Sequence, residues 1–130
     1  MSKQINPKEI NTTALAFLGD AVYEVFVRKY VMESGQQNAD ALHRMAIHYV
    51  CANGQAKAVK TLMNEFLTEE EIKLVKRARN RKSISRTRSA DAVSYKLATA
   101  FEALIGYLYL ENKMERAEEV MEEAVKIIER

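Results

Sequence analysis

Apolar residues recur at every third or fourth position along most of the chain, which is the spacing of an amphipathic α-helix. The first such stripe follows a candidate N-cap at Asn11 or Thr12. The stripe predicts a long helix that ends near Ser34 and Gly35. Its inward-facing residues are expected to be Leu15, Leu18, Val22, Val25 and Phe26.

Two further stripes precede position 80. Asn38 is expected to cap the first of them, and Gly54 is expected to kink or split it. The spacing of Thr68 and Glu71 predicts a capping box, which opens a helix that continues to about Asn80. The inward faces of these segments are expected to hold Leu42, Met45, Ala46, Tyr49, Val50, Val59, Leu62, Met63, Ile72 and Val75.

The last third of the chain predicts a loop and two helices. Residues 81–90 (RKSISRTRSA) have no periodicity and are expected to form a basic loop. Residues 97–110 are apolar on nearly every face, so this helix is expected at the centre of the molecule. Residues 113–129 are amphipathic, and no strand pattern competes anywhere. We therefore predict a single all-α domain over residues 1–130, a bundle of about six to seven helices.

Composition adds a cellular compartment to this picture. The chain has 130 residues, 48% of them hydrophobic, which is enough for one buried core. Cys51 is the only cysteine, so it forms no internal disulfide and is expected to act as a small core residue. The N-terminus lacks an apolar signal segment, and the longest apolar stretch is shorter than the roughly 18 residues of a membrane span. A soluble, cytoplasmic protein without membrane contact is expected.

The charges are distributed unevenly around a net charge of +2. Residues 73–88 contain eight basic residues and no acid, whereas residues 111–130 contain seven acids and four bases. A run of this kind is often a solvated face, but its density over a helix end and a loop is typical of contact with a phosphate backbone. The candidate phosphate contacts are Arg77, Arg79, Arg81, Lys82, Arg86 and Arg88.

Two carboxylates lie in apolar helices, where an unpaired charge is costly. Asp20 interrupts the first helix, and Glu102 interrupts the most apolar one. Two separate structural ion pairs would satisfy them, and so would one Mg²⁺ or Mn²⁺ bound by both. Glu24 lies one turn beyond Asp20 and is interpreted as a solvated or salt-bridged residue. A metal site and a phosphate-binding surface together indicate metal-assisted phosphodiester hydrolysis.

Tyrosines and histidines add no chemistry to this reading. Tyr23, Tyr95, Tyr107 and Tyr109 fall at helical spacing among apolar residues and are expected to pack in the core. The two histidines, His43 and His48, make no zinc motif with Cys51.

Two motifs resemble those of the ribonuclease III family. Residues 17–22 (FLGDAV) are similar to its first signature, and residues 101–106 (FEALIG), followed by YLYL, resemble its second. They occur in the family's order and at about its spacing, and the resemblance covers the chain from about Thr13 to Leu110. We expect no room for a double-stranded-RNA-binding domain after the last helix. With residues 76–80 (KRARN), this makes the chain similar to the short branch, Mini-ribonuclease III.

The resemblance implies an all-helical endonuclease domain that acts as a homodimer. It also implies cleavage of double-stranded RNA with Mg²⁺, for which Mn²⁺ substitutes. For the short branch it implies maturation of the ends of the large-subunit (23S) ribosomal RNA precursor in bacteria. A ribosomal protein that presents this substrate is a further expected partner.

The site residues follow from the matched motifs. Asp20 and Glu102 match the metal ligands of the first and second motif. Thr13, Ala16 and Thr99 stand where the family usually has further acids. Asp91 is interpreted as a helix N-cap.

Two other classes of protein remain open at this point. A non-catalytic RNA-binding module with the same fold would account for the missing acids at Ala16 and Thr99. A helical adaptor would use the acidic last helix to bind another protein, and its binding would not depend on the arginines.

Overall fold

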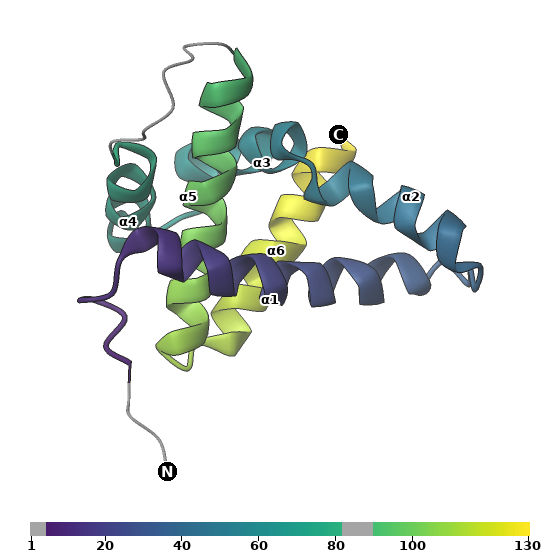
Figure 1. Ribbon diagram of the computed structural model, residues 1–130, viewed down its shortest axis with the longest axis horizontal. Coiled ribbons are helices and arrows are strands. Elements are labelled where there is room, and N and C mark those ends of the chain that lie inside the picture. The colour runs from purple at the N-terminus through teal and green to yellow at the C-terminus, as the bar shows by residue number, and fades with distance from the viewer. Residues whose placement is uncertain (1–4, 82–89) are drawn as a thin grey trace.

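The computed structural model describes residues 5–81 and 90–130, and that part of the chain forms six helices without a strand (Figure 1). The predicted all-α fold is therefore confirmed, and the number of helices agrees with the prediction. The predicted basic loop falls largely on residues 82–89, which lie outside the described residues. The helices are α1 (Thr12–Met32), α2 (Ala39–Val50), α3 (Ala52–Glu65), α4 (Glu69–Arg79), α5 (Ala90–Leu110) and α6 (Met114–Glu129).

The predicted helix starts are set by side-chain caps. Oδ1 of Asn11 accepts the backbone N–H of Thr13 at the start of α1, and Asn38 caps α2 in the same manner. Thr68 and Glu71 form both hydrogen bonds of the capping box that opens α4. Local chemistry in the sequence therefore fixes where three of the helices begin.

The break between α2 and α3 lies at Cys51, so the prediction of a break at Gly54 is wrong. Cys51 is extended, with φ −66° and ψ 155°, and its sulfur accepts the N–H of Gly54 at 3.4 Å. The side chain of Cys51 is exposed because it caps α3, and it is not the core residue that its hydrophobicity predicted. Gly54 instead allows a close turn, since a Cβ there would lie 2.9 Å from the carbonyl oxygen of His48.

Helix α1 ends close to the predicted position near Ser34 and Gly35. It stops at Met32, and its C-cap is Glu33. Gly35 follows with φ +92°, a backbone conformation that favours glycine, and the chain then turns into α2.

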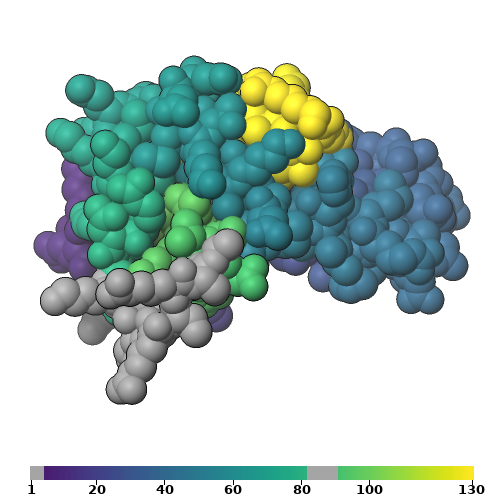
Figure 2. Space-filling view, turned by 90° about the horizontal axis from the view of Figure 1, so that it is seen from above, coloured from purple at the N-terminus to yellow at the C-terminus, as the bar shows by residue number. Residues whose placement is uncertain are grey.

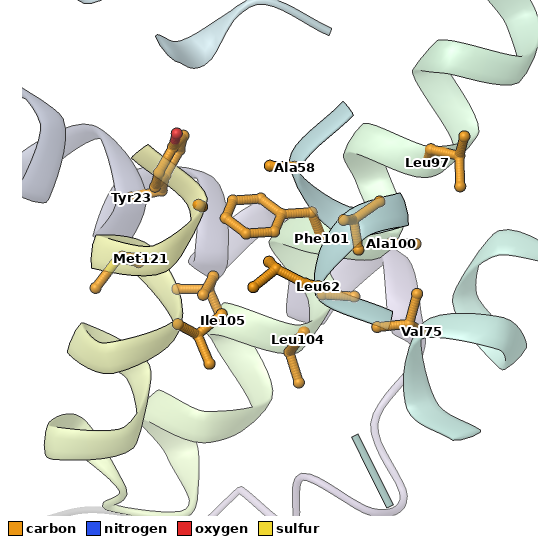
Figure 3. Close-up of a cluster of buried hydrophobic side chains, with 14 of the residues drawn as sticks. Tyr23, Ala58, Leu62, Val75, Leu97, Ala100, Phe101, Leu104, Ile105 and Met121 are labelled. Atoms are coloured by element: carbon orange, nitrogen blue, oxygen red, sulfur yellow. The ribbon is translucent and has the colours of Figure 1, made fainter. Parts of the chain in front are cut away.

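Helix α5 occupies the centre of the molecule, as its uniformly apolar sequence predicts. It packs against α1, α3, α4 and α6 (Figure 1). The ring of Phe101 meets that of Tyr23 edge to face, with centroids 4.9 Å apart, and both side chains are fully buried (Figure 3). The central helix therefore organises the core around the second motif.

Helices α1 and α5 cross in backbone contact at two glycines. A Cβ at Gly19 would lie 1.7 Å from the carbonyl oxygen of Glu102, and a Cβ at Gly106 would lie 2.0 Å from that of Leu15. No other residue fits at either position without separating the helices. The missing side chain at Gly19 therefore admits the backbone of α5. This crossing places Asp20 beside Glu102.

Helix α6 is fastened to the body by a half-buried arginine. Arg116 contacts both carboxylate oxygens of Glu71, at 2.9 and 2.8 Å, and its guanidinium lies 4.7 Å from the centre of the Phe66 ring. Burial raises the pKa of Glu71, but the bonds from Arg116 and Thr68 lower it further, so that it lies below its ordinary value. The pair ties the start of α4 to α6.

The far half of α1 and helix α2 form an arm that projects from the body (Figures 1 and 2). The C-terminal end of α6 supports this arm through Glu129. One oxygen of its carboxylate accepts hydrogen bonds from the hydroxyls of Tyr30 and Tyr49, at 2.6 and 2.7 Å. Over the described ranges, none of the helices combines the length and the hydrophobicity that a membrane crossing demands.

Candidate active site

Asp20 and Glu102 converge where α1 crosses α5. Burial, a hydrogen bond with Asp20 and the negative charge of Asp20 together raise the pKa of Glu102 to about 8. The side chain of Glu102 is half-buried, but Asp20 is exposed, so the interpretation of Asp20 as a core carboxylate is wrong. The exposure of Asp20 opens the pair to solvent on one side.

Gln55 of α3 is a third member of this cluster, and the sequence reasoning missed it. Its side chain is 2% exposed, and its amide forms a hydrogen bond with Glu102 that partly lowers the pKa of that carboxyl. A signal was present in the sequence, because Gln55 lies on the same face of α3 as the buried Val59 and Leu62. A polar residue on an apolar face needs a partner.

Glu24 lies at the edge of the site. It forms an ion pair with Arg28 at 3.2 Å, which confirms its interpretation as a salt-bridged residue. Its charge nevertheless contributes to the raised pKa of Glu102. Glu24 therefore adds negative potential to the site while its carboxylate is engaged by an arginine.

Ala16 and Thr99 stand where the family usually has acids, and neither position adds a carboxylate to the site. Ala16 is buried, and the hydroxyl of Thr99 donates to the carbonyl oxygen of Tyr95 at 2.9 Å. Asp91 lies inside the first turn of α5, where its charge suits the helix dipole, and its interpretation as the N-cap is wrong. Among residues 5–81 and 90–130, no three His, Cys, Asp or Glu side chains are grouped to hold a metal ion.

The pair nevertheless fits a hard divalent cation. Two carboxylates that raise each other's energy gain most from a neighbouring positive charge, and oxygen donors suit Mg²⁺ and Mn²⁺. Two protein ligands are also common for Mg²⁺, which keeps several of its waters. Asp20 and Glu102 would hold the cation, and water and substrate oxygens would complete its coordination.

Three of the candidate phosphate contacts, Arg77, Arg79 and Arg81, are described, and they lie at or just after the end of α4. Arg77 and Arg79 belong to its last turn, and Nε of Arg79 donates to Asn80 at 3.1 Å. Arg81 hydrogen-bonds to Asn11 and Thr13 at the start of α1. The predicted contacts Lys82, Arg86 and Arg88 lie outside the described residues.

Arg81 connects the end of α4 to the start of α1, the helix that carries Asp20. Thr13 precedes Asp20 by seven residues, which corresponds to about 10 Å along the helix axis. A chain of phosphates could therefore touch Arg81 and the carboxylate pair at once.

Apolar side chains lie exposed along α1. Phe17 is 84% exposed and Val25 is 69% exposed, so the prediction that Val25 faces inward is wrong. The same face borders a groove of about 930 Å³ between α1 and α6. Its apolar lining includes Leu18, Ala21, Val22, Val25, Phe26, Tyr109, Met114, Met121 and Val125.

The tyrosines divide between core and surface. Tyr23 is buried as predicted, and Tyr107 is half-buried. The prediction is wrong for Tyr95 and Tyr109, which are 67% and 44% exposed. Periodicity alone did not separate these cases, because α5 is apolar on most of its faces.

The chain is similar to known proteins over a range that includes both Asp20 and Glu102. The model of the Ribonuclease III domain family matches residues 13–113. Proteins named Mini-ribonuclease 3 are similar over nearly the full length. The protein from Brevibacillus brevis is 48% identical over 95% of this chain and 92% of its own, and that from Enterococcus faecalis is 45% identical over 92% and 91%.

A solved structure supports the same relationship. An X-ray crystal structure of a protein from Fusobacterium nucleatum superposes with a TM-score of 0.77 at 36% identity, over 96% of this chain and 98% of that one. The similarity therefore includes both helices that carry the carboxylates.

Proposed function

This chain belongs to the ribonuclease III family, as a ribonuclease III-type endoribonuclease of the Mini-ribonuclease 3 kind, and we propose that it cleaves double-stranded or structured RNA with a divalent cation held by Asp20 and Glu102. The observation that carries this proposal is the convergence of the two carboxylates at the glycine crossing. Mg²⁺ is the proposed cation, and Mn²⁺ is its substitute.

The protein's own residues bind the cation and position the RNA. When bound, Mg²⁺ supplies activation of a water molecule and stabilisation of the leaving oxygen. Asp20 and Glu102 provide the negative charge that attracts it. Arg77, Arg79 and Arg81 are proposed to neutralise backbone phosphates of the RNA, and the contact of Arg81 with the start of α1 supports this role. Lys82, Arg86 and Arg88 are proposed as further contacts on the basis of the sequence.

A homodimer is part of the proposal. Double-stranded RNA has two antiparallel backbones, and a two-fold pair of subunits presents one site to each. Phe17, Ala21 and Val25 form a stripe at four-residue spacing along α1, and all three are exposed. Large exposed apolar side chains on one helix face are typical of a surface that another protein covers.

The ribosomal substrate is a finer part of the proposal. We propose the precursor of large-subunit (23S) ribosomal RNA as the substrate and a ribosomal protein as its presenter, in the cytoplasm of the bacterial cell. The support is the resemblance to the short branch of the family. Recognition of such a duplex is expected to depend on its shape and phosphates rather than on base sequence.

A cleavage assay tests the proposed activity. The protein is incubated with a long RNA duplex and Mg²⁺, beside Asp20→Asn and Glu102→Gln. Wild type should cut, and each variant should lose about 100-fold or more in rate, because the cation loses a charged ligand. Both variants should still bind the duplex, with an affinity that falls steeply as salt rises.

The same assay separates the alternative functions. The missing acids at Ala16 and Thr99 favour the non-catalytic RNA-binding module, and binding without cleavage by wild type would establish it. Absence of RNA binding at low salt would favour the protein adaptor. Full activity of either variant would contradict the proposed site.

A further inference from the structure

Gln55 is the most buried polar side chain near the carboxylate pair. It lies in the first turn of α3, directly after the cap at Cys51. It is 2% exposed, and the neighbouring Ala56 is 3% exposed. Methionine or leucine would fill the same volume without burying polar atoms, so the amide requires an explanation other than packing.

The hydrogen bonds of the amide identify its orientation. Nε2 donates to the carbonyl oxygen of Val50 at 3.0 Å. The opposite orientation would set two acceptors, Oε1 and this carbonyl oxygen, against each other. The amide also interacts with the carboxyl of Glu102 and lowers its pKa, as a neighbouring N–H donor does. Gln55 therefore connects the end of α2 to the carboxylate on α5.

The oxygen of the same amide lacks a partner. Oε1 of Gln55 is buried and has no hydrogen bond to any described residue. A purely structural link between α2 and α5 gains nothing from an unpaired buried acceptor. A buried acceptor on the residue that contacts Glu102 suits a site that also contains ordered water, as the surroundings of a hydrated Mg²⁺ do.

We propose that Gln55 is a positioning residue, which holds the Glu102 carboxylate toward Asp20 so that both bind one divalent cation. This inference rests on the proposed function. Asp20 and Glu24 are both negative and disfavour the charged form of Glu102, whereas Gln55 favours it. Without the amide, the carboxylate of Glu102 would turn away from Asp20 and the cation would lose one of its two ligands.

Binding of Mn²⁺ tests this role without any RNA or catalysis. Free Mn²⁺ is titrated with protein and measured by electron paramagnetic resonance, for wild type and for Gln55→Met. The variant should bind Mn²⁺ about 10- to 100-fold more weakly, the usual effect of losing a residue that orients a metal ligand. Thermal unfolding with EDTA records its stability separately.

Tyr23→Phe provides the matched control. The Tyr23 hydroxyl also donates from a buried side chain to a carbonyl at the end of α2, that of Tyr49, at 2.9 Å. Both variants lose one such bond and should lose stability, but only Gln55→Met loses a bond to Glu102. Equal Mn²⁺ affinity in Gln55→Met and wild type would overturn the inference, as would an equal loss in both variants.

Two further proteins complete the test. If Gln55→Met does not fold, Gln55→Asn replaces it, since its shorter amide reaches one partner at most and should show the same weaker Mn²⁺ binding. Asp20→Asn shows whether the measured Mn²⁺ is at the proposed site. Wild type that binds no more Mn²⁺ than Asp20→Asn would overturn the proposed function together with this inference, whereas failure at Gln55 alone leaves the proposed function intact.

Discussion

At the scale of single residues, Glu102 is the carboxyl of the site whose pKa is raised. Its carboxyl is half-buried beside the negative Asp20 and Glu24, which raise its pKa, whereas Gln55 lowers it. The raised pKa therefore favours the protonated carboxyl of Glu102 near neutral pH when no cation is bound. Binding of Mg²⁺ or Mn²⁺ is expected to release this proton.

The raised pKa of Glu102 predicts how stability depends on pH. The pKa is about 8 in the fold and near the ordinary 4.5 in the unfolded chain, so the folded state binds more protons between these values. The free energy of unfolding, measured with EDTA, should therefore fall as the pH rises from 5 to 8. Thermal unfolding scans over this range provide the measurement.

Glu102→Gln is the control for this dependence. Its amide does not titrate, so its stability should change less between pH 5 and 8 than that of wild type. Glu71 does not interfere, because its pKa is lowered and its effect lies at more acidic pH. If the free energy of unfolding falls equally with pH in wild type and Glu102→Gln, another group is responsible for the dependence.

The sequence predicted the two carboxylates but not their surroundings. Asp20 and Glu102 stood out because a charge in an apolar helix is rare. Gln55 was missed although it is a polar residue on the apolar face of α3, since that pattern does not identify its partner on α5. The exposure of Val25 and Tyr95 was missed for a related reason, because periodicity identifies a helix face but not what covers it.

At the scale of helices, the glycine crossing predicts a large effect of one methyl group. Gly19→Ala would set its Cβ against the carbonyl oxygen of Glu102, and the backbone there has no room to yield. We expect a loss of about 3 kcal/mol or more in the free energy of unfolding, measured by urea denaturation. The cleavage rate should fall with it, since the carboxylates would separate.

Gly35→Ala is the comparison for this substitution. No atom lies within 4 Å of a Cβ at Gly35, and only its φ of +92° resists a side chain. The expected loss is about 1 kcal/mol, without an effect on cleavage. Equal losses at both glycines would mean that the crossing can relax.

The ion pair between α4 and α6 predicts a second effect on stability. Arg116→Met leaves the carboxylate of Glu71 buried without its partner, and we expect a loss of about 2 kcal/mol in urea denaturation. Arg130→Met removes an exposed ion pair with Glu65, at 3.6 Å, and should change stability by less than about 0.5 kcal/mol. A similar loss in both variants would contradict the importance of burial at Glu71.

Helix starts were easier to predict than helix breaks. The caps at Asn11, Asn38 and Thr68 act within one turn, so the sequence alone identifies them. The break at Cys51 depends on how α2 and α3 pack, and cysteine is not among the usual capping residues. Gly54 drew the prediction because glycine is the stronger signal, although the turn begins three residues earlier.

At the scale of the whole molecule, the exposed stripe on α1 predicts the oligomeric state. Phe17→Glu places a charge at the most exposed apolar residue of the stripe. We expect it to weaken the homodimer about 100-fold or more, because a carboxylate replaces an aromatic side chain that the partner subunit would bury. Sedimentation velocity over a range of protein concentrations measures the change.

Tyr95→Glu is the matched control for this prediction. Tyr95 is also a large exposed side chain, at 67%, but it lies near the start of α5 and not on the α1 stripe. It should leave the dimer unchanged. Wild type that sediments as a monomer would contradict the homodimer, and an equal effect of Tyr95→Glu would place the interface elsewhere.

The glycine crossing also limits how such a site can evolve. Asp20 and Glu102 are 82 positions apart, yet the close backbone approach at Gly19 and Gly106 fixes them beside each other. The two motifs therefore constrain each other. We expect that small shifts of the helices are not a source of new metal geometry. Variation has to come from side-chain exchange around a fixed centre, at positions such as Ala16 and Thr99.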